Sequence, residues 1–272
     1  MVAFGSSAWW SATGCYNPVR QLPMLSVYLL PSSYETYQQI PLGSLLERSS
    51  ELARGTIIAV RPSPPMGWPE MAQAITAVAE RHARAPMCLW LDLVTRKEAI
   101  TATQRCRLLG VRAVIDVPIL DKERLRDQLS DMNGFERDVV PCCRRFGLRV
   151  DAAVAERISL IAVQADRYRT FAGLSAALML NRPMWRASFK TRDLGSPTSW
   201  FRVLRLVKIA TAIQRDPNRT VADIAVQFEF FDDAAVRRQL RAVLGAAPSD
   251  ARSHLGWEWI LADGLRRAGI RA

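Results

Sequence analysis

The sequence predicts two regions of different fold class, an α/β region with a parallel sheet followed by an all-α region. Short apolar or β-branched segments at residues 25–30, 56–60, 87–93 and 111–117 alternate with amphipathic stretches, which is typical of a parallel sheet with helical crossovers. From about residue 135 onward, apolar residues recur at spacings of three and four, which predicts helices. The 272 residues are enough for two domains of ordinary size.

Composition and periodicity suggest four segments along the chain. We expect an irregular arm over residues 1–23, an α/β domain over 24–130, a helical connector over 131–165 and a helical domain over 166–272. Helices of the α/β domain are predicted at residues 69–83, 95–109 and 120–129, and a tail helix is predicted at 255–267. The connector is interrupted at Gly147, and its apolar stripe is compatible with core, linker or dimer seam.

The whole chain has a formal net charge of +11, and more of this positive charge lies in its C-terminal part than in its N-terminal part. Residues 1–150 contain 18 basic and 14 acidic side chains, whereas the shorter segment 151–272 contains 19 and 12. This shorter segment, which contains the helical domain, therefore holds +7 of the total. A basic domain attracts a polyanion, and nucleic acid is the usual one.

The sequence gives no sign of a membrane or secretory protein. The first twenty residues lack a basic segment followed by an apolar run, and no apolar run reaches the roughly 18–20 residues of a membrane helix. The five cysteines are odd in number and match no zinc-ligand spacing, so we expect reduced thiols, with redox sensing by Cys142 and Cys143 as the alternative. We expect a cytoplasmic protein.

The chain offers little for catalysis. It contains only two histidines, His82 and His254, which are far apart in the sequence. No glycine-rich phosphate loop, nucleophile elbow or paired acid motif is present. We therefore expect no enzyme, no cofactor and no metal site.

In the order of its elements, the segment 24–130 resembles a receiver-type, flavodoxin-like domain. A receiver needs a carboxylate after its central strand and an acidic pair after its first strand to hold magnesium. Here the strands end in Val60 and Leu30, and Asp116 stands where a lysine is expected. These departures favour a scaffold of receiver shape that binds a protein partner, a second copy of the chain or nothing known, without phosphoryl transfer.

The segment 220–252 has the pattern of two short helices joined by a turn. Thr220 is suited to cap the first helix, and a second helix begins near Asp233. Arg237 and Arg238 project from the side of the second helix opposite its apolar face. This arrangement is what a helix-turn-helix requires.

The same segment resembles the second helix-turn-helix unit of the AraC/XylS family of regulators. The places of the family pattern are held, without a gap, by Thr220, Ile224-Ala225, Glu229-Phe230, Val236, Arg238, Leu240, Leu244, Gly245, Pro248 and Ala251-Arg252. The family's first unit has its counterparts at Leu174-Ser175, Met179, Asn181, Trp185, Ala187, Phe189, Leu194, Ser196-Pro197, Trp200 and Arg205-Leu206. The chain departs from the pattern at three expected glycines (Met179, Leu194 and Glu229) and at an expected arginine (Ala187).

The resemblance implies that two recognition helices enter successive major grooves, about 34 Å apart, with residues 206–214 in the helix that joins the units. The residues placed toward base edges are Arg182, Met184, Arg186, Asp233, Ala234, Arg237 and Arg238. Asn181 and Thr220, at helix starts, are placed toward phosphates. For Asp233 we favour a capping role over a contact with cytosine.

Together these patterns predict a sequence-specific transcription regulator that binds double-stranded DNA. The alternative is a protein-interaction module whose helix-turn-helix domain no longer binds DNA. The lost glycines and Ala187 favour the alternative, whereas the basic excess of residues 151–272 favours the regulator.

Overall fold

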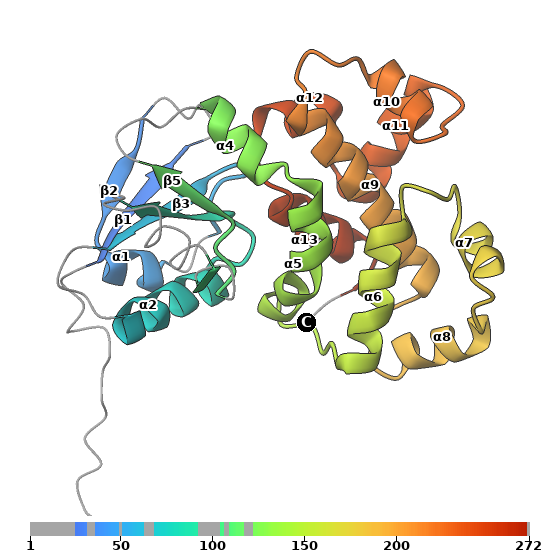
Figure 1. Cartoon of the computed structure of the whole chain (residues 1–272), viewed down its shortest axis with the longest axis horizontal. Helices are drawn as coiled ribbons and strands as arrows, with labels where there is room; N and C mark the ends of the chain where they lie inside the picture. Colours follow the sequence, from blue (N-terminus) through green and yellow to red (C-terminus); the bar gives the residue numbers. More distant parts are fainter. Residues whose placement is uncertain are drawn as a thin grey trace, which may run out of the picture.

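The computed structural model describes residues 25–31, 36–48, 51–62, 68–91, 104–105, 109–116 and 122–270. The expected arm at 1–23 and most of the expected helix at 95–109 lie outside the described residues. The two-region organisation is confirmed at the level of fold class: a sheet with helices forms the first region, and helices alone form the second (Figure 1).

The first region is built on a five-stranded mixed sheet with the strand order β2-β1-β3-β4-β5. Its strands β3, β4 and β5 are parallel, whereas β1 is antiparallel to both of its neighbours, β2 and β3. The bounds are β1 Leu25–Leu30, β2 Gln38–Ile40, β3 Ile57–Pro62, β4 Met87–Leu91 and β5 Ala113–Asp116.

The prediction of a wholly parallel sheet is wrong for its first strand. Parallel neighbours need a long crossover, usually a helix, and the segment between β1 and β3 forms instead the short edge strand β2 and the six-residue helix α1 (Leu42–Glu47). The antiparallel register, in which Val27 lies opposite Val60, needs no crossover. Because β1 is reversed, its end at Leu30 lies at the sheet edge opposite the end of β3, unlike in a receiver.

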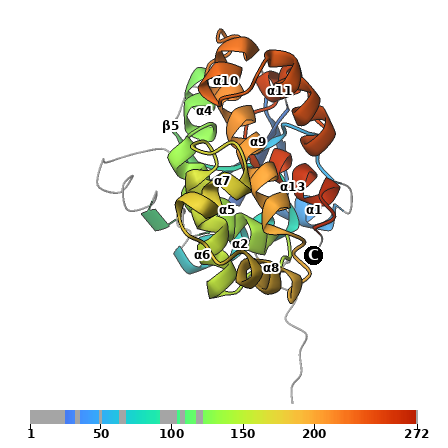
Figure 2. The same cartoon turned by 90° about the vertical axis from the view of Figure 1, so that its right-hand side faces the viewer.

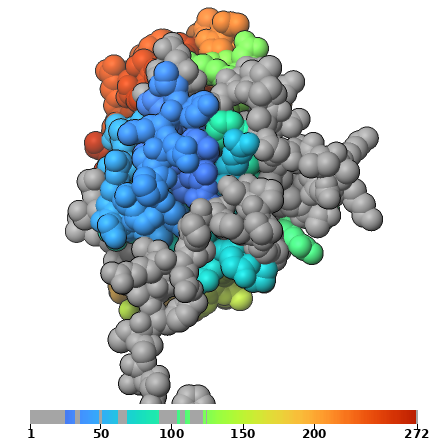
Figure 3. Space-filling view, turned by 90° about the vertical axis from the view of Figure 1, so that its left-hand side faces the viewer, coloured from blue at the N-terminus to red at the C-terminus, as the bar shows by residue number. Residues whose placement is uncertain are grey.

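Strict alternation along the strands supplies two apolar faces, as the period of two requires. Val27, Val60 and Leu89 face α1 and α2 (Trp68–Arg81). Tyr28, Ala59 and Trp90 belong to the opposite core, with α4 (Lys122–Leu129). Figure 3 views the molecule from the side of the first strands, with the C-terminal helices behind them.

The second region is a helical bundle with a single large apolar core. The connector is divided as predicted: Gly147, at φ 85°, separates its two helices. The helices are α5 Met132–Arg145, α6 Ala152–Gln164, α7 Phe171–Ala177, α8 Arg182–Lys190, α9 Pro197–Arg215, α10 Val221–Gln227, α11 Asp233–Gln239, a π-helical turn Leu240–Leu244, α12 Pro248–Ser253 and α13 Glu258–Arg267.

The central element of the bundle is α9, whose 19 residues are buried over most of its length. It contacts α6, α12, α13 and the π-helical turn most extensively. In Figure 2, which looks onto the helical side, α10 and α11 lie toward one end of α9 and α8 toward the other. No helix among the described residues combines the length and the apolar character needed to span a bilayer.

The adjacent thiols of Cys142 and Cys143 are buried in the core of the bundle. Burial raises the pKa of Cys142 to about 12 and raises the pKa of Cys143 well above its ordinary value. Thiolate is the reactive form of cysteine, so the redox alternative loses its physical basis.

A buried ion pair fastens the two regions together. Arg112, which precedes β5, donates to the Glu258 carboxylate of α13 at 3.0 Å, and the two side chains are 3% and 1% exposed. The second terminal nitrogen of Arg112 donates to the Leu129 carbonyl at 2.6 Å, and its guanidinium lies 4.8 Å from the ring centroid of Trp257. Removal of one partner would leave a buried charge without compensation.

We therefore expect Glu258→Gln to lower the free energy of unfolding by about 3 kcal/mol, because Arg112 stays charged in a dry site. Arg112→Met combined with Glu258→Leu should recover most of the loss. Urea denaturation followed by circular dichroism measures both. The control is Asp138→Asn, which breaks the more exposed Arg137–Asp138 pair and should cost less than about 1 kcal/mol. Equal losses in the two single variants would contradict the role of the buried pair.

Candidate nucleic-acid interface

The first helix pair, α7 and α8, is fixed at both starts by side-chain caps. The Thr170 hydroxyl accepts from the Gly173 amide at 3.1 Å, and the Asn181 side chain accepts from the Met184 amide at 3.1 Å. Trp185 and Phe189 turn the inner face of α8 into the core. The opposite face of α8 is therefore held in a fixed orientation toward solvent.

The second helix pair, α10 and α11, begins with a complete capping box. The Thr220 hydroxyl accepts from the Asp223 amide at 3.1 Å, and the Asp223 carboxylate accepts from the Thr220 amide at 3.1 Å. The Thr220 hydroxyl also donates to the Asp223 carboxylate at 2.6 Å, and this bond, together with the bond from the Thr220 amide, lowers the pKa of Asp223, so its carboxylate is ionised at neutral pH. Val236 anchors α11 in the core.

The turn of each pair contains a residue in the left-handed region at an equivalent position. Met179 has a φ of 49° and Glu229 a φ of 52°, and both occupy places where the family pattern has glycine. At the third expected glycine, Leu194 is buried, and its neighbours Asp193 and Gly195 take positive φ values instead. The backbone thus keeps the turns without the glycines, at a steric cost of about 1–2 kcal/mol for each such residue.

The outer faces of α8 and α11 hold the side chains that we predicted for base contacts. Those that are exposed are Arg182, Met184, Arg186, Ala234, Arg237 and Arg238, while Asp233 is partly buried. Among the described residues, no carboxylate forms an ion pair with Arg182, Arg186 or Arg238. These guanidinium groups remain available to an external anion.

The capping role favoured for Asp233 is wrong. The cap of α11 is the preceding residue, Asp232, whose carboxylate accepts from the Ala235 amide. Asp233 lies in the first turn and pairs with Arg237, one turn later, at 3.1 Å. Asp232 has the extended backbone of a cap, and the sequence Asp232-Asp233 alone did not distinguish the two.

At the two predicted phosphate contacts, most backbone amides of the helix start are already bound or absent, for different reasons. At Thr220 the amide is already bound by the Asp223 carboxylate, whose charge repels a phosphate. At Asn181 the side chain binds the Met184 amide, and Pro183 lacks an N–H, which leaves few amides free. Any phosphate contact at these positions therefore depends on side chains such as Arg182.

Arg205 of α9 links the two helix pairs, a role that its place in the sequence motif did not reveal. Its guanidinium is buried and donates to three carbonyls: Ala165 at 3.1 Å, Tyr168, and Phe228 at the end of α10. Burial lowers the pKa of Arg205, and the nearby Glu229 carboxylate opposes this shift. One side chain thus joins the segment before α7 to the turn after α10.

Lys208, one turn along α9, reinforces the same junction. Its ammonium pairs with Glu136 of α5 at 2.6 Å and with Asp166 at 2.7 Å, and it donates to the Val163 carbonyl at 3.1 Å. The sequence offered one signal for both residues, namely that they continue a series of cations at spacings of three, which begins at Arg202, along a largely apolar helix. A buried cation on such a helix needs acceptors, and here it finds them in the turn between α6 and α7.

Comparison of the chain with protein-family models, with curated proteins and with solved structures finds no match. Among the described residues, no group of three or more His, Cys, Asp or Glu side chains is placed to hold a metal ion. The functional interpretation of the helix pairs therefore depends on their geometry and charge.

Replacing Met179 by glycine should raise the free energy of unfolding by about 0.5–1 kcal/mol, because relief of the left-handed strain exceeds the added entropy of the unfolded chain. Chemical denaturation measures the change. Leu178→Gly is the matched control: Leu178 has a φ of −99°, where glycine brings no relief, and should destabilise. A loss of stability in Met179→Gly would show that the turn is not strained.

Arg205→Lys should lower the free energy of unfolding by about 2–4 kcal/mol, because one ammonium cannot satisfy three carbonyls arranged around a planar guanidinium. Arg202→Lys, one turn earlier on the exposed side of α9, is the control and should change stability by less than about 0.5 kcal/mol. Urea unfolding of the two variants makes the comparison. If they were equally stable, the junction would not depend on the guanidinium.

Proposed function

We propose that the chain is a sequence-specific DNA-binding transcription regulator of the AraC/XylS type, acting in the cytoplasm. In this proposal each helix pair is a helix-turn-helix unit, and α8 and α11 are the recognition helices. The observation that carries it is that two capped helices present exposed arginines, Arg186 on α8 and Arg238 on α11, that form no ion pair with any residue the structure describes. Arginine binds the major-groove edge of guanine with two hydrogen bonds.

The helix between the units supports the proposed spacing. With 19 residues, α9 is about 28 Å long. In Figure 2, α8 and α11 lie toward opposite ends of this helix, which suits recognition helices about one DNA turn, roughly 34 Å, apart. The buried contacts of Arg205 would keep that spacing fixed before DNA binds, so little ordering would accompany binding.

In this proposal the α/β region does not carry out phosphoryl transfer. The residues at the ends of β1 and β3 include no acidic pair, and these ends lie at opposite edges of the sheet. Its proposed role is a contact with a protein partner or with a second copy of the chain. Dimerisation would place two pairs of recognition helices on one operator.

One observation favours a second function, a protein-interaction module without DNA binding. Large apolar side chains are exposed beside the turns of both pairs: Met179 is 91%, Val226 77% and Phe231 92% exposed. Exposed apolar clusters often mark protein contacts. The three side chains are apolar and are not among the arginines proposed to bind DNA, so DNA binding does not explain their exposure.

The deciding experiment is a fluorescence-anisotropy titration of the full chain with a random duplex pool across a salt series, followed by selection of bound sequences. Affinity should fall steeply as salt rises, because each neutralised phosphate releases counterions. Arg186→Ala and Arg238→Ala should each weaken binding to the selected sequence by about 1–3 kcal/mol and relax the preference at one position. Arg48→Ala, an exposed arginine of the α/β region, is the control and should change nothing.

A chain that binds no duplex at low salt would overturn the regulator proposal and favour the interaction module. Binding with a normal salt slope but without any selected sequence would leave a nonspecific DNA-binding protein. In either case Phe231→Ser would be the next variant, since the exposed ring is the strongest candidate for a protein contact.

A further inference from the structure

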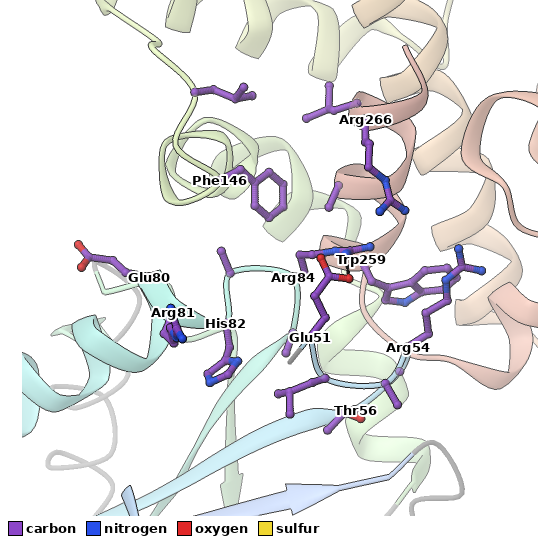
Figure 4. A pocket seen from close by; sticks show the side chains of 18 of the residues that line it. Glu51, Arg54, Thr56, Glu80, Arg81, His82, Arg84, Phe146, Trp259 and Arg266 are labelled. Carbon is purple, nitrogen blue, oxygen red and sulfur yellow. Dashed lines mark ion pairs between the residues drawn. The ribbon is translucent and has the colours of Figure 1, made fainter. Parts of the chain in front are cut away.

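A cavity of about 440 Å³ opens between the sheet region and α13. One wall is formed by residues 51–56, which precede β3, and by residues 80–85, which follow α2. The other wall is formed by α13 and by Phe146, in the turn after α5. Figure 4 shows Phe146, Trp259 and Arg266 around the same space as Glu51 and Arg84. The volume lies in the range of small-molecule sites, which often occur between domains.

The wall contributed by the helical region is largely apolar. Trp259, Ala262 and Arg266 follow one another on α13 at spacings of three and four, so they share one face of the helix. Leu265, and Phe146 and Leu148 from the turn after α5, extend this surface. Two aromatic side chains and several aliphatic ones suit a flat apolar ligand body.

One buried donor in the wall lacks an acceptor. The side chain of Trp259 is 2% exposed, and its indole Nε1–H has no hydrogen-bond partner among the described residues. Buried donors are nearly always paired, so an exception calls for a physical explanation. An acceptor atom of a ligand in the cavity would satisfy this donor.

The charges around the cavity favour an anion. Asp263 is fully buried and pairs with Arg54 at 2.7 Å, with Arg266 at 2.8 Å and with Arg84. Glu51 also pairs with Arg84. Arg81 and Glu80 also line the cavity, so four guanidinium groups face three carboxylates. The Arg54 guanidinium lies 5.6 Å from the ring of Trp259, beside the unpaired indole.

We propose that this cavity binds a small organic acid with an aromatic or similarly flat apolar body. The body lies between Phe146 and α13, and the carboxylate accepts from Trp259 Nε1 and from the surplus guanidinium charge. Charge-assisted hydrogen bonds of this kind are about twice as strong as neutral ones. Apolar walls with a few convergent polar groups are typical of sites for such ligands.

The cavity also has a route to the second helix pair. Gly264 of α13 lies so close to Leu244 and Val203 that a β-carbon would meet their side chains at 2.7 and 2.9 Å. Arg54 reaches from the cavity to the Gly245 carbonyl, directly after the π-helical turn that continues α11, at 3.5 Å. A ligand that draws Arg54 toward its carboxylate would change this contact. This step rests on the proposed DNA binding, whereas ligand binding itself does not.

Isothermal titration calorimetry of the full chain tests the site with benzoate, 1-naphthoate and indole-3-carboxylate, each beside its neutral amide. At least one acid should bind, and its amide should bind at least about tenfold more weakly. Trp259→Phe keeps the ring but removes the donor, and should weaken binding of the acid about three- to tenfold. Ala262→Trp should abolish binding by filling the cavity. Ala153→Trp, at an exposed position of α6, is the matched control and should bind as the natural chain does.

Three results would each overturn the site: no acid binds up to millimolar concentration, acids and amides bind equally, or a folded Ala262→Trp variant binds undiminished. If Ala262→Trp lowers the unfolding midpoint, the affinities of the Trp259→Phe variant for the acid and of the natural chain for the amides test the site instead. The anisotropy titration with DNA is then repeated with the acid present. A changed DNA affinity supports the route through Arg54, and an unchanged one overturns that route alone. A chain that binds no DNA leaves the calorimetric result standing.

Discussion

The helical region depends on the burial of two cations, Arg205 and Lys208, one turn apart on α9. Taking a charge out of water is costly unless its donors are satisfied, so the surrounding chain is arranged to supply carbonyls and carboxylates. Ala165, Tyr168 and Phe228 provide the carbonyls for Arg205, at the ends of elements that are far apart in the sequence. These acceptors lie shortly before α7 begins and directly after α10 ends.

Packing and capping fix the orientation of α8, the first proposed recognition helix. A helix of nine residues such as α8 has little stability alone, and its position comes from tertiary contacts. Trp185 and Phe189 hold one side of it, and the caps fix its start. With turns that already adopt the left-handed conformation at Met179 and Glu229, the helix pairs are preorganised at the cost of some stability. Loss of the glycines therefore does not imply loss of the turns.

Much of the fold could be predicted from periodicity, because long amphipathic segments and capping residues act locally. The strand Leu25–Leu30, the break at Gly147 and the cap at Thr220 are examples. The direction of β1 could not be predicted, since strand pairing is decided by contacts with β3 that no local pattern encodes. The cap of α11 was misassigned between two adjacent aspartates for a related reason: a capping residue is defined by its backbone conformation.

In the candidate site, too, some residues could be predicted from the sequence and others could not. The outward arginines of α8 and α11 follow from helical spacing once the inner faces are known, so the sequence sufficed to name them. The acceptors of Arg205 lie 23 to 40 residues away along the chain, and no spacing rule reveals them. The cavity beside Trp259 was likewise not foreseen, because its two walls come from different regions.

The junction between the two regions contains two buried carboxylates of the described residues. Glu258 and Asp263 of α13 are both buried, and each is paired with arginines of the α/β region. Such pairs contribute little net stability, but they make the relative placement of two elements specific, because a shifted interface would leave charges unpaired. Gly264 of α13 also packs closely against α9. The helix α13 therefore contacts both the sheet region and the helix that joins the two helix pairs. A change that the α/β region undergoes on meeting a partner or a ligand can therefore reach α9, and the helices that flank it, through α13.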